Sequence, residues 1–210
     1  MNELDWLSNT SSVDDATLDI GFIVRSSFYY GAENNFTPEQ WESLREPLRQ
    51  PDVERFGDFV LAYNIEHRVT ELIAYYKDVV RLARKHSKKL ANQKSYFWMR
   101  PLIYRHDDFA VTFPWYDTYG ESERFFDNLA NATDGQVFWD RGQCWELTVY
   151  VKDGRLYVRE WNPDDEEEHV QFNCPLDNLC GQVAAVRKRS DAIMDQLRAG
   201  LGNDYWSRKT

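Results

Sequence analysis

The sequence predicts a single α+β domain in which helices pack against an antiparallel sheet. Segments with apolar residues at every third or fourth position occur beside segments of period two, and no linker rich in Pro, Gly or Ser separates them. The chain has 210 residues, 42% of them hydrophobic and 15% aromatic, which is enough for a substantial core. We therefore expect one domain over residues 1–210, with about four helices, a hairpin and a meander of three to four strands.

The N-terminal part begins with a polar segment. Residues 1–17 are rich in Ser, Asn and Asp and are expected to form a loose lead-in. Residues 17–30 contain enough apolar side chains for a strand or short buried segment. The capping-box pattern at residues 37–40, with proline at the first helical position, then predicts a helix that runs to about Gln50.

The middle of the chain predicts a long helix followed by a hairpin. Apolar residues over 59–83 recur at helical spacing, and the polar side of this segment is basic towards its end. The sequence pattern then changes to a period of two over residues 96–104 and 109–115, and we interpret these two segments as the strands of a hairpin. Pro101 predicts that the first of these strands is an edge or bulged strand, and a short helix is expected from Ser122.

The clearest pattern is an antiparallel meander over residues 136–139, 143–151 and 155–161. Its last two strands are joined by Asp153-Gly154, a pair that favours a type I′ turn because both positions need a positive φ. A two-residue turn fixes the register of the hairpin. Residues expected to face each other are Val151 and Leu156, Tyr150 and Tyr157, and Val149 and Val158.

The C-terminal part continues with an acidic loop over residues 162–169. One further strand is expected around residues 170–174, where apolar and polar side chains alternate. A final helix begins near Pro175 and ends at Gly200 or Gly202, since glycine is favoured just after a helix C-terminus.

Charge is distributed unevenly along this acidic chain, whose net charge is −10. Residues 106–170 carry a net charge of −11, whereas residues 67–105 carry +8. Phosphates are repelled by a strongly acidic protein, so general nucleic-acid binding is disfavoured. We interpret the basic stripe Arg81–Lys94 as a solvated helix face in preference to a nucleic-acid site.

The expected location is the cytoplasm. The first residues are acidic and lack the basic start of a signal peptide, and no run of about 18 apolar residues is available to span a membrane. Cys144, Cys174 and Cys180 are an odd number at spacings that fit no metal motif, which favours reduced thiols.

No catalytic, metal or cofactor motif is visible. The four histidines are scattered, and neither a phosphate-binding loop nor a nucleophile elbow occurs. His169 beside the acids of residues 164–168 has the donors for a divalent ion, but a solvated acidic turn is the preferred interpretation. We expect no metal, no cofactor and no enzymatic activity.

The outer face of the meander is the candidate binding site. Aromatic rings on what should be a solvated face, next to a group of acids, are typical of a surface that accepts a basic protein. The alternative is that a helix of the same chain covers this face. The candidate residues are Trp139, Glu146, Tyr150, Tyr157, Glu160, Trp161, Asp164, Asp165, Glu166, Glu167 and Glu168.

A strand pattern runs from Trp139-Asp140 through Trp145-Glu146-Leu147-Thr148-Val149 to Leu156–Trp161. In a small acidic α+β protein, this pattern resembles that of the bacterial immunity proteins of polymorphic or contact-delivered toxins. The resemblance implies a cytosolic protein that neutralises a basic toxin domain by occlusion. An acidic regulatory or adaptor protein with another partner is the first alternative. The second is an enzyme assembled from scattered residues such as His67, Asp108 and Glu160.

Overall fold

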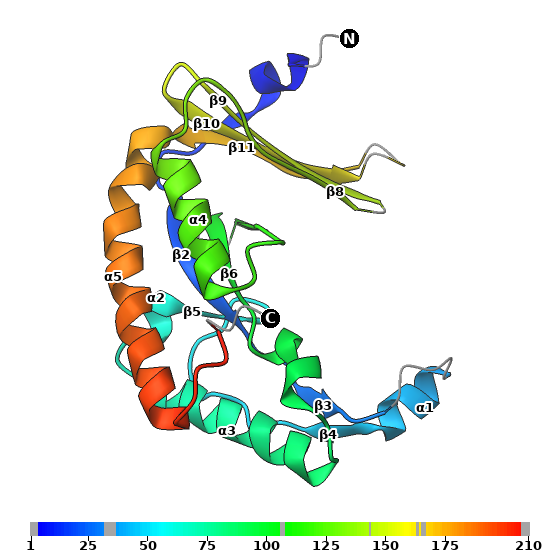
Figure 1. Cartoon of the computed structure of the whole chain (residues 1–210). Helices are drawn as coiled ribbons and strands as arrows, with labels where there is room; N and C mark the ends of the chain where they lie inside the picture. The colour runs from blue at the N-terminus through cyan, green and yellow to red at the C-terminus, as the bar shows by residue number, and fades with distance from the viewer. Residues whose placement is uncertain are drawn as a thin grey trace.

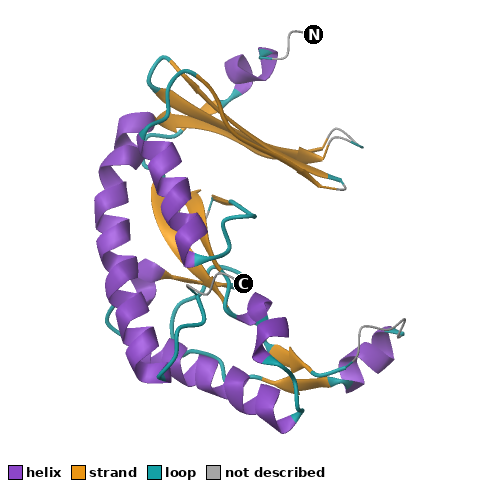
Figure 2. Cartoon of the chain, viewed as in Figure 1, coloured by secondary structure: helices purple, strands orange, loops and turns teal. Residues whose placement is uncertain are grey.

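The computed structural model shows an α+β fold, in which the described residues form five α-helices, three 3-10 helices and eleven strands in three sheets. The described residues are 4–31, 37–105, 108–142, 144–162, 164 and 167–206, with only the backbone described at 167 and 168. The longest helix, α5 (Leu176–Leu201), contacts α2, α3, α4 and strands of two sheets. Figure 1 shows α5 along one side of the molecule, and Figure 2 shows the two larger sheets beside it.

The meander forms β8, β9 and β10 of the largest sheet, and its last two strands have the predicted register. The sheet has the order β1-β11-β10-β9-β8. Asp153 and Gly154 have φ values of 51° and 72°, as the predicted turn requires. The three predicted cross-strand pairs are all present. The strands are β1 (Ser11–Ser12), β8 (Gly135–Gly142), β9 (Trp145–Lys152), β10 (Arg155–Asn162) and β11 (Glu167–Pro175).

Part of the segment expected to be a loose lead-in forms secondary structure. The 3-10 helix η1 (Asp5–Asn9) buries Trp6 and Leu7, and β1 pairs in parallel with β11. The Gln171 side chain donates a hydrogen bond to the carbonyl of Trp6 at 3.1 Å. Burial of Trp6 and Leu7 and the pairing of β1 with β11 stabilise this segment. Its polar composition predicted neither the burial nor the pairing.

A second sheet has the order β5-β2-β6-β7. Pro101 lies in β6, which pairs with β2 and β7 in continuous register, so the prediction of an edge or bulged strand is wrong. The carbonyl of Pro101 accepts a hydrogen bond from the amide of Phe113, which lies beyond the end of β7. Proline has no amide hydrogen, and here that hydrogen would point past the end of β7, where the sheet needs no hydrogen bond. The strands are β2 (Thr17–Ile23), β5 (Phe59–Leu61), β6 (Met99–Arg105) and β7 (Phe109–Thr112).

The helix predicted to reach Gln50 ends earlier. Its capping box is present, but α1 (Pro38–Ser43) is followed by β4 (Arg45–Pro47), which pairs with β3 (Ser27–Tyr29). Pro47 explains the difference, because proline disfavours a helical residue before it and lacks the amide donor.

The long helix predicted from residue 59 is divided. Its first residues form β5 and the short helix α2 (Ala62–Ile65), and the main helix is α3 (Val69–Lys85), followed by η2 (Leu90–Asn92) and η3 (Lys94–Tyr96). The amide of Tyr63 donates to the buried carboxylate of Asp19, which also pairs with Arg189 at 3.2 Å. The carboxylate of Asp19 on β2 therefore links α2, through the amide of Tyr63, to α5, through Arg189.

The remaining helices have clear end signals. Thr118 and Glu121 form a capping box at the start of α4 (Tyr119–Ala130), three residues before the predicted start at Ser122. Gly202, with a φ of 65°, ends α5 at one of the two predicted glycines. Within the described ranges, no helix has the length and apolar character needed to cross a membrane.

Candidate partner-binding surface

The predicted aromatic face of the meander is formed, but its rings are half-buried. Tyr150 and Tyr157 lie opposite each other, and Trp161 follows on the same face four residues after Tyr157. The guanidinium of Arg159 lies 3.7 Å from the centroid of the Trp161 ring. A cation of the same chain therefore already covers one of the rings predicted to bind the partner.

The chain itself also covers one part of this face. By register, Gln171 lies on the same face as Arg159, and Asn173 lies beside Tyr157. Both amide side chains donate to backbone carbonyls of residues 6–11. The N-terminal segment, which includes the 3-10 helix η1, thus occupies the β11 side of the face.

The predicted acids are divided between the two faces of the sheet. Glu146 lies on the aromatic face, where its carboxylate is 3.9 Å from the guanidinium of Arg141. Glu160 lies on the inner face, because it is opposite Leu147, and it accepts a hydrogen bond from the indole of Trp145 at 2.5 Å. Glu160 therefore does not join the rings of Tyr157 and Trp161.

The acidic turn is described only in part. Asp164 accepts a hydrogen bond from the thiol of Cys144 at 3.2 Å, while Asp165 and Glu166 lie outside the described residues. The backbones of Glu167 and Glu168 pair with Asn162 and Trp161 in the sheet. Among the described residues, no three His, Cys, Asp or Glu side chains are grouped as a metal site requires, and the absence of a bound metal stays a prediction.

Two tryptophans have highly exposed side chains. Trp139, one of the predicted residues, is 55% exposed on the edge strand β8. Trp115 is 73% exposed, although the sequence pattern placed it at the end of a strand. A signal for its real position was available, since the Pro-Trp pair stands just before the capping box that begins α4.

The backbone holds Trp115 away from the core. Pro114 and Trp115 form a turn in which Trp115 has a φ of 71°, a left-handed conformation that normally favours glycine or asparagine. Its neighbours are anchored: Phe113 packs at 4.4 Å from the Phe125 ring, and the Tyr116 ring meets that of Phe125 edge-on. The core thus fixes both ends of the turn and leaves the indole outside.

The same turn is fastened on its far side. The guanidinium of Arg100 pairs with Asp117 at 2.6 Å, and the carbonyl of Asp117 accepts from the amide of Met99. Burial raises the pKa of the Tyr116 phenol above its ordinary value. The turn that carries the exposed indole is thus anchored on both sides.

Two hollows of about 410 and 330 Å³ meet at this turn. Pro114, Trp115 and Asp140 line both of them. Trp139 lines the larger hollow from the edge strand β8, although its position opposite Thr148 directs its side chain to the aromatic face. Glu160 lines the smaller hollow. We name this area the tryptophan surface and define it by Trp115, Trp139, Asp140 and Glu160.

Asp140 is the unusual group of the tryptophan surface. Its Oδ2 atom is buried and accepts no hydrogen bond from the described residues. The three nearby guanidinium groups are paired elsewhere, Arg100 with Asp117, Arg124 with Glu121 and Arg141 with Glu146. A buried acceptor without a donor is costly unless something supplies one.

The tryptophan surface has the chemistry to hold a cationic side chain. An ammonium or guanidinium group is attracted to a Trp face and forms a charge-assisted hydrogen bond with a carboxylate. In contrast, the residues suggested for an enzyme have separate partners, since His67 contacts Glu66 and Asp108 contacts Arg105. Comparison with protein families, with curated proteins and with solved structures found no match to this chain.

Proposed function

We propose that this protein binds a basic protein partner through the tryptophan surface and neutralises it by occlusion, in the manner of a cytoplasmic immunity protein that blocks a toxin. Trp115 carries the proposal. A non-glycine residue in the left-handed region costs about 1–2 kcal/mol, and here that cost keeps an indole 73% exposed. Strain of this kind is typical of functional sites.

The charges around Trp115 favour a cationic partner. Asp140 and Glu160 lie on the inner face of the sheet, both opposite Leu147 on β9. The segment 106–170, which contains the whole surface, carries a net charge of −11. Charge of this sign raises the association rate of a basic protein, and buried indoles supply affinity once contact is made.

The test begins with capture of the partner from the native host and its identification. The wild-type protein, Trp115→Ala/Trp139→Ala and Tyr63→Ala are then compared for affinity to the purified partner. Tyr63 is the matched control because it is also an exposed ring, 64% accessible, but lies on α2. We expect a loss of about 3 kcal/mol or more for the double variant and less than about 0.5 kcal/mol for the control.

The partner's properties decide between the candidate functions. A basic partner whose toxic activity disappears on binding supports neutralisation. A basic partner with unchanged activity would support the adaptor alternative instead. An acidic partner, or one that binds the folded Trp115→Ala/Trp139→Ala variant with full affinity, would overturn the assignment of this surface.

A further inference from the structure

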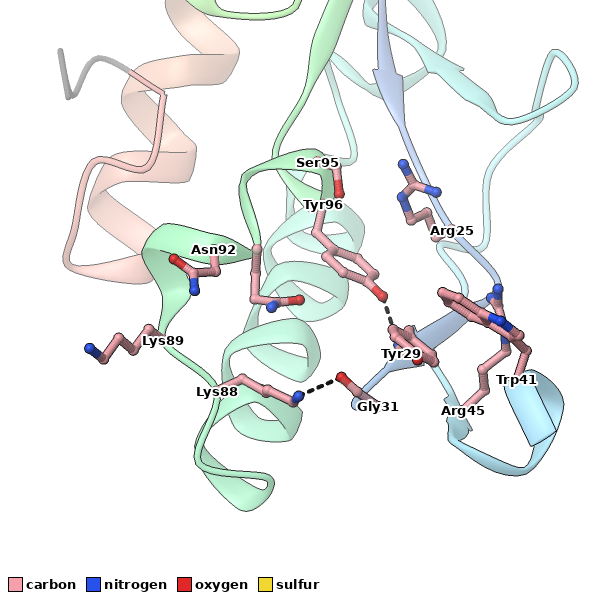
Figure 3. A pocket seen from close by; sticks show the side chains of 11 residues that line it. Arg25, Tyr29, Gly31, Trp41, Arg45, Lys88, Lys89, Asn92, Ser95 and Tyr96 are labelled. Atoms are coloured by element: carbon pink, nitrogen blue, oxygen red, sulfur yellow. Dashed lines mark hydrogen bonds between the residues drawn. The ribbon is translucent and has the colours of Figure 1, made fainter. Parts of the chain in front are cut away.

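A basic pocket of about 550 Å³ lies between the β3–β4 ribbon and the segment after α3. Figure 3 shows Lys88 and Lys89 on one side and Arg25, Trp41 and Arg45 on the other. We name it the basic pocket and define it by its cationic and aromatic lining. The residues are Arg25, Arg45, Lys88, Lys89, Tyr29, Trp41 and Tyr96.

The pocket is cationic in a chain whose net charge is −10. None of the described residues that line it is acidic. Arg25 and Lys89 form no ion pair within the described part of the chain, and Lys88 donates to the carbonyl of Gly31 at 2.6 Å. Arg45 pairs with Glu42 at 3.4 Å, outside the lining. Positive charge therefore faces the pocket with little compensation.

The wall that carries the two lysines is built by the end of α3. Ser87 has a φ of 53°, the amide of Lys88 donates to the carbonyl of Ala83, and the amide of Ser87 donates to that of Arg84. This is the hydrogen-bond pattern of a Schellman motif. The turn fixes the backbone from which Lys88 and Lys89 enter the pocket.

The opposite wall alternates rings with cations. Trp41 and Tyr29 are stacked at 4.4 Å between centroids, and the guanidinium of Arg45 lies 5.8 Å from the Tyr29 ring. The guanidinium of Arg25 lies 5.6 Å from the centroid of the Tyr96 ring. Tyr96 is buried, and its hydroxyl accepts a hydrogen bond from the amide of Tyr29 at 2.8 Å. On this wall, aromatic ring faces and guanidinium groups therefore lie next to each other.

We propose that the basic pocket binds a nucleoside phosphate. Lysine and arginine bind phosphate oxygens, and an aromatic wall stacks against a planar base. A volume of about 550 Å³ is in the range of small-molecule sites. The net charge of −10 repels a long polyanion outside the pocket, which favours a single nucleotide over a nucleic-acid strand.

The test is isothermal titration calorimetry of the full chain with ADP as the probe. Adenosine, inorganic phosphate and a single-stranded oligonucleotide serve as comparison ligands. We expect one ADP per chain and binding at least about tenfold weaker for adenosine and for phosphate alone. No binding of ADP would overturn the proposal. Equal affinity for ADP and phosphate, or much tighter binding of the oligonucleotide, would overturn the assignment to a nucleotide.

Two pairs of variants separate pocket charge from overall charge. Arg25→Ala/Lys89→Ala removes two cations from the pocket, and Lys152→Ala/Lys188→Ala removes two exposed lysines from β9 and α5. We expect the first pair to weaken ADP binding at least about tenfold and the second to leave it within about twofold. Equal losses would show that only net charge matters, contrary to the proposal.

The aromatic wall is tested separately. Trp41→Leu should weaken the binding of ADP and leave the weaker binding of inorganic phosphate unchanged. A circular-dichroism melt reports whether the variant is folded. A folded variant that binds ADP as the wild type does would contradict the proposed stacking. The β3–β4 ribbon lies at the other end of the molecule from the β8–β11 sheet, so partner binding and nucleotide binding succeed or fail independently (Figure 1).

Discussion

Replacing Trp115 with glycine should separate stability from binding. Glycine relieves about 1–2 kcal/mol of left-handed strain but adds about 0.5–1 kcal/mol of backbone entropy to the unfolded chain. The indole is 73% exposed, so about a quarter of a side chain that buries up to about 250 Å² is in contact, worth roughly 1.5 kcal/mol. The net change in the free energy of unfolding should therefore lie between about zero and a loss of about 1.5 kcal/mol.

Binding should respond differently. An indole that anchors a partner contributes about 2 kcal/mol or more, so Trp115→Gly should weaken binding roughly 30-fold or more. Urea unfolding followed by far-ultraviolet circular dichroism gives the stability, and surface plasmon resonance with the identified partner gives the affinity. Stable protein that binds poorly is the expected outcome.

Trp115→Ala is the informative control for the backbone. Alanine loses the same indole contacts but keeps a Cβ in the left-handed region, so it should be less stable than the glycine variant. At ordinary positions glycine is the less stable of the two. If Trp115→Ala proves more stable than Trp115→Gly, the strained turn on which the proposal rests does not exist.

Three further predictions concern the fold. Gly154→Val should destabilise the protein by about 1 kcal/mol or more, because valine resists the φ of 72° required in the β9–β10 turn; an unchanged thermal melt would refute that turn. Burial raises the pKa of the Asp19 carboxyl, so folding favours its protonated form, and stability should decline as pH rises above the unfolded pKa and through the folded one. Asp19→Asn should remove this part of the decline in urea titrations at a series of pH values, whereas a parallel decline in both proteins would contradict it. Burial also raises the pKa of the Cys174 thiol to about 12, so a thiol reagent at pH 8 should label exposed Cys144 first and Cys174 only on unfolding; early labelling of Cys174, located by mass spectrometry, would count against its burial.

The sequence predicted the elements whose signals are local. Alternation along residues 143–161 and the Asp153-Gly154 pair are sufficient to define a hairpin with one register. The capping signals at residues 37–40 also located a helix start correctly. Element ends were harder to predict, because Pro47 competes with the helical pattern before it and tertiary pairing draws residues 59–61 into a sheet.

The binding surface was only partly predictable. Trp139 was identified from its place in the first strand of the meander, but Trp115 was not, because a left-handed tryptophan contradicts the local preference of the residue. The candidate residue Trp161 is covered by Arg159. Alternation places both side chains on one face of the strand but does not show that they are in contact. The basic pocket combines Arg25, Arg45 and residues 88–96, which only the folded chain brings together.

The most direct test of the central claim is a double-mutant cycle between Asp140 and the basic residues of the identified partner. Asp140→Asn keeps the shape of the side chain and removes its charge, and each lysine or arginine at the partner's interface is changed to alanine in turn. If a cation of the partner enters the tryptophan surface, one pair should show a coupling energy of about 1.5 kcal/mol or more. Coupling below about 0.5 kcal/mol for every pair would contradict the claim.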